Sequence, residues 1–136
     1  MQLILPGKTD VAILKLAGQN LYSRLLDAGV RIFEYQPQVL HAKLLIIDDV
    51  VYVGSCNLDV RSLRLNFELL IRVPDARIAE QARELVANDA ELCKPIEPEQ
   101  WEKETTWWRK LQCKIAYWLV TRLDPFLARR RLRTLR

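Results

Sequence analysis

The chain has 136 residues, 50% of them hydrophobic and 28% charged, a balance that suits one ordinary domain and excludes disorder, collagen and a simple coiled coil. No charge-free stretch approaches the roughly 18 to 20 apolar residues of a membrane span, and the first residues open no secretory signal. The net charge of +4 hides an asymmetry, because residues 1–100 hold 11 Lys and Arg against 14 Asp and Glu, whereas residues 101–136 hold 10 against 3. We therefore expect a body, residues 1–98, and a basic appended segment, residues 99–136.

The first part of the chain predicts a strand, a helix and a second strand. A short apolar run at residues 3–5 stops at Pro6-Gly7 and reads as a strand. Thr9 or Asp10 can cap one helix with apolar residues at helical spacing, which we expect to end at Gly29. Residues 30–35 then alternate apolar and charged side chains, as a strand does.

The middle of the chain predicts a hairpin, a strand and a helix. Residues 40–47 and 50–53 are rich in β-branched and other apolar residues and hinge at Asp48-Asp49, which is typical of a hairpin. Residues 67–73 form another strand-like run, and a helix begins at Pro74-Asp75. Because crossover connections and a hairpin occur together, we predict an α/β layered domain with a mixed β-sheet flanked by helices.

The three cysteines are widely separated and follow neither a Cys-x-x-Cys nor a Cys/His spacing; they are Cys56, Cys93 and Cys113. This pattern predicts neither a disulfide framework nor a zinc site, and it favours a reducing, cytoplasmic setting.

A group of residues suited to phosphate chemistry lies in the predicted hairpin. His41 and Lys43 would project from the same face of a strand, because side chains alternate. Lys43 supplies a positive charge and Asn57 an amide donor, while Gly54-Ser55 lets the backbone and a hydroxyl approach an anion. These features together favour a phosphoryl centre as the substrate.

His41, the only histidine, could attack phosphorus through one ring nitrogen if a carboxylate held the proton of the other. Glu68 is the candidate for that carboxylate. Asp48 is better placed to position Lys43 or the hairpin than to react. Taken singly, a lone histidine, an Asp-Asp turn and a Gly-Ser-x-Asn loop are more often structural. Six fixed positions together arise by chance at a given start on the order of once in 10^7 to 10^8.

The pattern His41-x-Lys43-x4-Asp48, followed by Gly54-Ser55-x-Asn57, resembles the His-Lys-Asp signature of the phospholipase D superfamily. The continuation from Asn57 to Glu68 is similar to that of bacterial cardiolipin synthases and is the more specific signal. The resemblance implies the C-terminal half of such an enzyme, lacking the first strand and helix of its half-domain. Five residues separate Asp48 from Gly54, where six are commoner in the family, and we expect the shorter hairpin to be tolerated.

The resemblance implies a catalytic set of four residues, His41, Lys43, Asp48 and Glu68, and phosphate binding by three, Lys43, Ser55 and Asn57. His41 would form the phosphohistidine or protonate the leaving group, and Glu68 would orient it. Lys43, Ser55 and Asn57 would bind phosphate, while Asp48 completes the signature. No metal and no cofactor are implied. The substrate would be phosphatidylglycerol, whose phosphatidyl group passes to a second phosphatidylglycerol.

Because the family's site joins two histidine motifs and this chain has one, a second His-Lys-Asp half is expected, from an upstream domain or a homodimer. Two alternatives remain open: a homodimeric phosphodiesterase or nuclease of the same superfamily, and an inactive truncated half that binds membrane or a partner.

The segment after residue 98 predicts a basic amphipathic helix. From Trp107, apolar residues follow helical spacing through Trp118 to Leu123, and an arginine-rich end follows at residues 129–136. Tryptophan and basic side chains favour an anionic membrane surface, which would place the chain peripherally on the cytoplasmic side of the membrane. A helix packed on the body and a nucleic-acid contact are the alternatives, of which nucleic acid is the less favoured.

Overall fold

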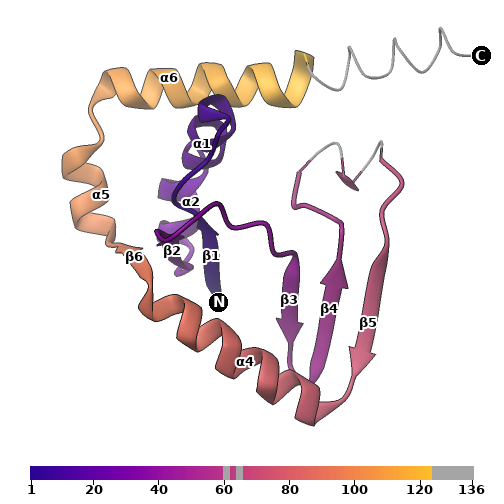
Figure 1. Cartoon of the computed structure of the whole chain (residues 1–136). Coiled ribbons are helices and arrows are strands. Elements are labelled where there is room, and N and C mark those ends of the chain that lie inside the picture. Colours follow the sequence, from indigo (N-terminus) through magenta and orange to yellow (C-terminus); the bar gives the residue numbers. More distant parts are fainter. Residues whose placement is uncertain (60–61, 64–65, 124–136) are drawn as a thin grey trace, which may run out of the picture. The chain divides into compact units, whose positions relative to one another are not determined.

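The structure is a computed structural model, and it describes residues 1–59, 62–63 and 66–123. The chain forms two compact units (Figure 1). The first unit contains residues 1–40 and the chain from residue 92 onward, and the second contains residues 41–91. These units do not coincide with the expected division at residue 98, which rests on composition and stays a prediction.

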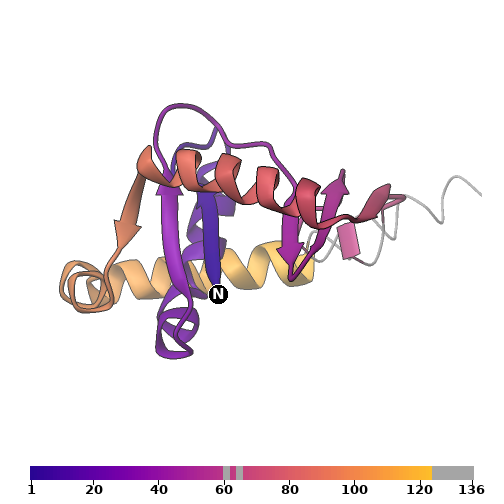
Figure 2. The same cartoon turned by 90° about the horizontal axis from the view of Figure 1, so that it is seen from below.

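The sheet of the first unit is mixed. Strand β2 (Arg31–Tyr35) lies between β1 (Gln2–Pro6), which is parallel to it, and β6 (Cys93–Ile96), which is antiparallel (Figure 2). The two strands expected here, at residues 3–5 and 30–35, are thus confirmed in position. Ile32 on β2 is 1% exposed, and this central strand supplies the core of the unit.

The helix expected from Thr9 or Asp10 to Gly29 is instead two helices, α1 (Ala12–Gln19) and α2 (Tyr22–Asp27). The break follows Gly18, a weak helix former, and the Leu21 N–H donates to the Gly18 carbonyl three residues back, as in a tightened final turn. The expected end at Gly29 is confirmed: its φ of 76° lies in the left-handed region that glycine adopts freely after a helix.

Two further helices and a π-helical turn complete the described part of the first unit: α5 (Pro98–Glu104), α6 (Trp107–Trp118) and η1 (Leu119–Leu123). Thr106 caps α6, because its hydroxyl accepts a hydrogen bond from the Arg109 N–H. The expected helix from Trp107 is therefore present, and it packs along α1. The arginine-rich end at residues 129–136 lies outside the described residues.

A buried polar network, which the sequence analysis did not foresee, joins the helices of this unit to its sheet. The carboxylate of Glu34 accepts hydrogen bonds from Gln19 Nε2 (3.3 Å) and from Tyr22 Oη (3.1 Å), and it pairs with Lys15 Nζ at 3.4 Å. Arg109 on α6 donates to Gln19 Oε1 at 2.9 Å. Burial, and then the charge of Glu34, raise the pKa of Tyr22. The network links β2, α1, α2 and α6.

The second unit contains an antiparallel sheet and one long helix. Strand β4 (Val50–Gly54) lies between β3 (Leu44–Ile47) and β5 (Leu70–Pro74), and α4 (Ala76–Glu91) packs on β3 and β4. Within the described residues the strands thus form two three-stranded sheets and not one: the first is the mixed sheet that we predicted, and the second, antiparallel sheet was not expected as a separate one. The α/β class and the hairpin are confirmed.

Candidate active site

The candidate site lies at the end of the second sheet where β3 begins, β4 ends and β5 begins. The Gly54 N–H donates to the Lys43 carbonyl (3.3 Å), and the Ser55 N–H donates to the Leu69 carbonyl (2.9 Å). These bonds continue the strand pairing one step beyond the strands themselves. The backbone therefore brings Lys43, Ser55 and the residue before Leu69 to one edge, although they are distant in sequence.

Gly54 permits this close approach. A Cβ atom at residue 54 would lie 2.0 Å from the Leu69 carbonyl oxygen, a separation that no side chain tolerates. The glycine of the Gly-Ser-x-Asn pattern is thus required by backbone packing.

Ser55 and Glu68 are joined by a short hydrogen bond. Ser55 Oγ donates to Glu68 Oε2 at 2.5 Å and accepts from the Leu69 N–H at 3.1 Å. Asn66 Nδ2 donates to the other carboxylate oxygen, Oε1, at 3.2 Å. These donors, Ser55 foremost, lower the pKa of Glu68, and the positive charge of Lys43 adds to the effect. Lys43, Ser55 and Glu68, all predicted from the sequence, therefore form one cluster.

His41 lies before β3 and not on it, because the strand begins at Leu44. The expectation that strand alternation aligns His41 with Lys43 is therefore wrong. What links them is a hydrogen bond from Lys43 Nζ to the His41 carbonyl oxygen at 2.7 Å. His41 is exposed, and its imidazole has no hydrogen-bond partner within residues 1–59, 62–63 and 66–123. Glu68 contacts Ser55 and Asn66 in this arrangement, not the imidazole.

Asn57 is exposed. It lies two residues after Ser55 and three residues after the end of β4. Its carbonyl oxygen accepts a weak hydrogen bond from Cys56 Sγ at 3.5 Å. In the part of the chain that the structure describes, the side-chain amide of Asn57 makes no hydrogen bond.

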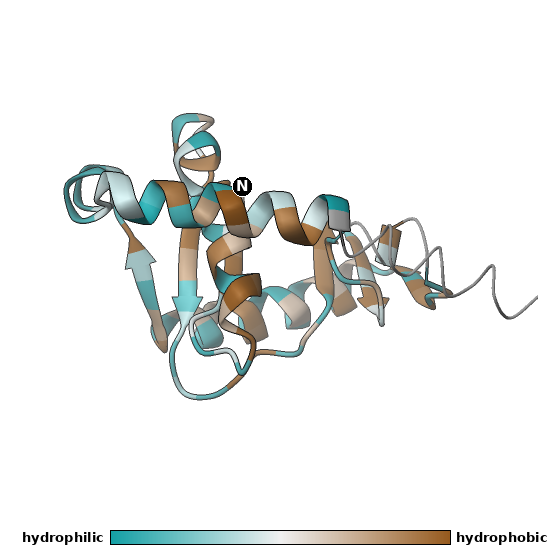
Figure 3. Cartoon of the chain, turned by 90° about the horizontal axis from the view of Figure 1, so that it is seen from above, coloured by the Kyte–Doolittle hydropathy of each residue, from teal (hydrophilic) through white to brown (hydrophobic). Residues whose placement is uncertain are grey.

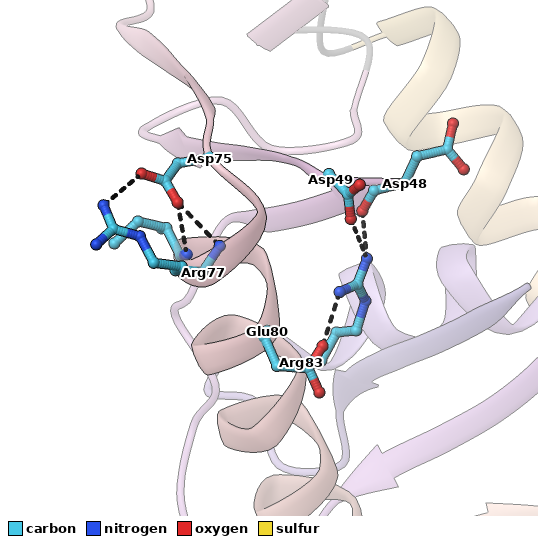
Figure 4. Close-up of polar contacts among 7 residues, drawn as sticks. Asp48, Asp49, Asp75, Arg77, Glu80 and Arg83 are labelled. Carbon is cyan, nitrogen blue, oxygen red and sulfur yellow. Dashed lines mark hydrogen bonds and ion pairs between the residues drawn. The ribbon is translucent and has the colours of Figure 1, made fainter.

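Asp48 lies at the opposite end of β3 from Lys43, in the two-residue turn to β4 (Figure 4). Its φ of 48° is left-handed, which aspartate tolerates in hairpin turns. Arg83 on α4 donates to the Asp48 main-chain carbonyl, and the same guanidinium pairs with Asp49 Oδ1 (3.4 Å) and Glu80 Oε2 (2.9 Å). The surroundings of Asp48 are those of a turn held to a helix.

Ser62, which sequence reasoning did not single out, is 6% exposed, and its hydroxyl has no hydrogen-bond partner among the described residues. The Ser62 hydroxyl nevertheless helps to lower the pKa of the Glu68 carboxyl. Because the hydroxyl is not hydrogen-bonded to any described residue, we attribute this effect to electrostatic attraction at longer range. The Ser62 N–H donates to Asp59 Oδ1 at 2.8 Å, as in a helix cap. The feature that identifies Ser62 is a buried hydroxyl beside a carboxylate, and its burial is known only from the fold.

A family model described as "Cardiolipin synthase, PLD-like domain" matches residues 1–90, which include every residue of the candidate site. The chain belongs to this phospholipase D-like family. The match also covers both units in part, since residues 1–40 and 41–90 lie on either side of their boundary.

Curated relatives in the cardiolipin synthase family agree with this assignment. The chain is 33% identical over 111 residues to Cardiolipin synthase A of Wigglesworthia glossinidia brevipalpis, 81% of this chain and 22% of that protein. It is 38% identical over 104 residues to Cardiolipin synthase A of a Pseudomonas putida strain, 76% of this chain and 22% of that protein. It is 35% identical over 128 residues to Cardiolipin synthase 1 of Staphylococcus epidermidis, 93% of this chain and 25% of that protein.

The chain thus spans about a quarter of the length of these cardiolipin synthases. No solved structure gives a significant match.

Proposed function

We propose that the chain carries one half of a phosphatidyltransferase site, in which His41 forms a covalent bond to the phosphorus of phosphatidylglycerol. The observation that supports this most is that Lys43, Ser55 and Glu68 lie at one sheet edge, where a 2.5 Å hydrogen bond joins Ser55 to Glu68 and the charge of Lys43 acts on Glu68. Membership of the cardiolipin synthase family supports a phospholipid substrate. The chemistry needs no metal or cofactor.

Lys43 and Asn57 are the groups best suited to hold the phosphate. Lys43 brings a full positive charge, and the Asn57 amide is a donor with no partner among the described residues. The Ser55 hydroxyl is occupied by Glu68 and Leu69. Ser55 can donate to phosphate only when its proton turns away from Glu68, so we assign it the double duty of holding the carboxylate and then contacting the substrate.

The reaction consists of two displacements at phosphorus. In the first, a neutral His41 ring nitrogen forms a P–N bond, the P–O bond to the headgroup glycerol breaks, and the glycerol oxygen takes a proton from a second, protonated histidine. In the second, that histidine removes a proton from the hydroxyl of another phosphatidylglycerol, whose oxygen forms the new P–O bond as the P–N bond breaks. Because the chain contains one histidine, the second must come from another His-Lys-Asp half.

Glu68 supplies the negative charge that this cycle needs near His41. Its lowered pKa keeps it ionised at neutral pH, so it can accept the proton on one imidazole nitrogen and leave the other free to attack. We propose that this contact forms when substrate and the second half are bound. Asp48, held in the turn near Arg83, would stabilise the hairpin that carries the site and would not contact substrate.

Covalent trapping tests the proposal. The full chain, combined with an upstream His-Lys-Asp half, is mixed with phosphatidylglycerol labelled with ³²P and quenched in alkali, in which phosphohistidine survives. We expect label on this chain at His41, none in His41→Ala, and little in Lys43→Ala. Lys94→Ala, which removes an exposed lysine on β6, is the matched control and should label normally. Label on any other residue would overturn the assignment.

A further inference from the structure

Helix α6 carries an exposed apolar stripe that the proposed reaction does not use. Its members are between 38% and 64% exposed, and they follow one face of the helix: Trp107, Trp108, Leu111, Ile115 and Trp118. In Figure 3, which views the chain from above, the turns of α6 alternate between hydrophobic and hydrophilic colours. We call these five residues the tryptophan stripe.

The orientation of α6 is the reverse of that of an ordinary packed helix. Its small residues Cys113 and Ala116 are each 3% exposed, and α6 packs on α1. At 100° per residue, the centre of the tryptophan stripe lies about 160° around the helix from the midpoint of these two residues. Arg109, on the packed side, is held by Gln19 at 2.9 Å. Folding of this unit therefore leaves the largest apolar side chains of α6 outside, although burying them would contribute more.

The aromatic rings of the stripe form a platform. Trp107 and Trp108 stack with ring centroids 4.0 Å apart and ring planes 26° from parallel. By contrast, Trp101 on α5 packs against Tyr22 at 5.0 Å and donates its indole N–H to Ser23 Oγ at 3.3 Å. Half-buried Trp101 is thus held within the first unit by its ring and its indole N–H, whereas Trp107 and Trp108 stack on each other and stay exposed.

The charge carried by α6 and the turn after it is basic, although Lys110 on α6 pairs with Glu102 on α5 at 3.6 Å. Residues 107–123 contain four basic residues and no acidic residue. Lys114 lies beside the stripe on the helix wheel, is exposed, and has no ion-pair partner among the described residues. Arg122 is exposed in the following turn. Tryptophan flanked by unpaired basic side chains fits a surface that is apolar below and anionic above, as the headgroup region of a bilayer is.

The length of α6 sets how it can meet such a surface. None of the helices in the described part of the chain is long and apolar enough to cross a membrane. With 12 residues, α6 is about 18 Å long, short of a hydrocarbon core of about 30 Å. A helix with one apolar face and basic flanks fits the plane of a membrane interface, with the tryptophan stripe toward the bilayer.

We propose that the tryptophan stripe docks the chain on an anionic phospholipid bilayer, with α6 parallel to the surface. This role is separate from catalysis, because the stripe lies in the first unit and the candidate active site in the second. It would hold the chain at a surface on which lipid substrates lie.

Flotation with vesicles tests the docking. Vesicles of equal parts phosphatidylcholine and phosphatidylserine are used in place of phosphatidylglycerol, so that surface binding is measured without the proposed substrate. We expect the full chain to bind, to bind vesicles of phosphatidylcholine alone much more weakly, and to be released as salt rises. The double variant Trp108→Ser/Ile115→Ser should bind at least tenfold more weakly. Lys114→Glu should bind about tenfold more weakly at low salt.

Matched controls separate the stripe from general stickiness and from the active site. Ile78→Ser/Leu85→Ser removes two exposed apolar residues of α4, and Arg24→Glu reverses an exposed charge on α2; both should bind like the unaltered chain. His41→Ala should also bind normally, so failure of the proposed reaction would not imply failure of docking.

Three results would overturn the proposal: no binding by the unaltered chain, equal binding to neutral and anionic vesicles, or undiminished binding by the stripe variant. Sedimentation without lipid tests whether a second copy of this chain, and not a membrane, covers the tryptophan stripe. A dimer that Trp108→Ser/Ile115→Ser dissociates, together with unchanged vesicle binding, would assign the stripe to self-association and refute the membrane role.

Discussion

Ser55 Oγ donates a 2.5 Å hydrogen bond to Glu68 Oε2, which ties the end of β4 to the residues that precede β5. The same hydroxyl accepts from the Leu69 N–H, so its orientation is fixed from both sides. As a result, the Glu68 carboxylate has a fixed position near Lys43 and a lowered pKa before any substrate is bound.

Removing the Ser55 hydroxyl should raise the pKa of Glu68, because that hydrogen bond is the main cause of its lowering. A lowered pKa stabilises the fold above the unfolded-state value, and this gain is lost as pH falls through the folded value. Ser55→Ala should therefore lack the gain at neutral pH and lose less stability than the unaltered chain as pH falls. A ¹³C NMR titration of the glutamate carboxyls measures the shift. Ser55→Thr keeps a hydroxyl and serves as control. An unmoved Glu68 titration in Ser55→Ala would contradict the assignment.

Glu68→Gln should leave the fold intact and lower the rate of transfer by about 10²-fold or more, because the amide cannot accept the imidazole proton as a carboxylate does. The measurement is turnover with the upstream half present, with circular dichroism as the check on folding. Glu80→Gln, which alters an exposed carboxylate on α4, provides the comparison. A normal rate in Glu68→Gln would show that Glu68 only supports the loop.

Gly54→Ala should destabilise the second unit by about 2 kcal/mol or more, because its Cβ would meet the Leu69 carbonyl oxygen. The matched substitution Gly18→Ala has nothing within 4 Å and lies in α1, where alanine should stabilise by about 0.5–1 kcal/mol. Urea unfolding followed by circular dichroism compares the two midpoints. Equal effects of both substitutions would refute the steric role of Gly54.

Tyr22→Phe should cost about 1–2 kcal/mol of unfolding free energy, because it removes a buried donor to the Glu34 carboxylate. Tyr117→Phe, in α6, removes a hydroxyl without a hydrogen-bond partner among the described residues and should cost little. Thermal unfolding of both variants gives the comparison. Should Tyr22→Phe prove neutral, the network around Glu34 does not stabilise the first unit.

Local patterns in the sequence were enough to predict several elements and the residues of the site. The alternation at residues 30–35 predicted β2, and the Asp48-Asp49 hinge predicted the β3–β4 hairpin, because each pattern lies within a single strand or turn. Lys43, Ser55 and Glu68 were each selected from residue chemistry and resemblance. Their contact was not predicted, because Glu68 was expected to orient His41 and instead bonds to Ser55. The family pattern consists of residue types at fixed spacings, and these can be matched directly in a sequence.

The features that were missed depend on contacts between distant segments. The start of β3 at Leu44 places His41 outside the strand, and pairing with β4 sets that start, not the propensity of residues 40–47. The division into two sheets depends on which strands pair, which periodicity does not reveal. The Ser55–Glu68, Gln19–Glu34 and Gln19–Arg109 hydrogen bonds join residues that are 13, 15 and 90 positions apart in the sequence. Exposure of the tryptophan stripe is visible only once α6 is seen to pack through Cys113 and Ala116.

The central claim is that His41 is one of two histidines that the reaction requires, and turnover measured together with mass tests it most directly. The chain is incubated with labelled phosphatidylglycerol in mixed micelles while sedimentation gives its state of association, first alone and then with an upstream His-Lys-Asp half. We predict no cardiolipin from the monomer, because one imidazole cannot be both the covalent nucleophile and the acid that protonates the departing glycerol. Activity should appear when the second half is supplied. Sustained turnover by a demonstrably monomeric chain would contradict the account.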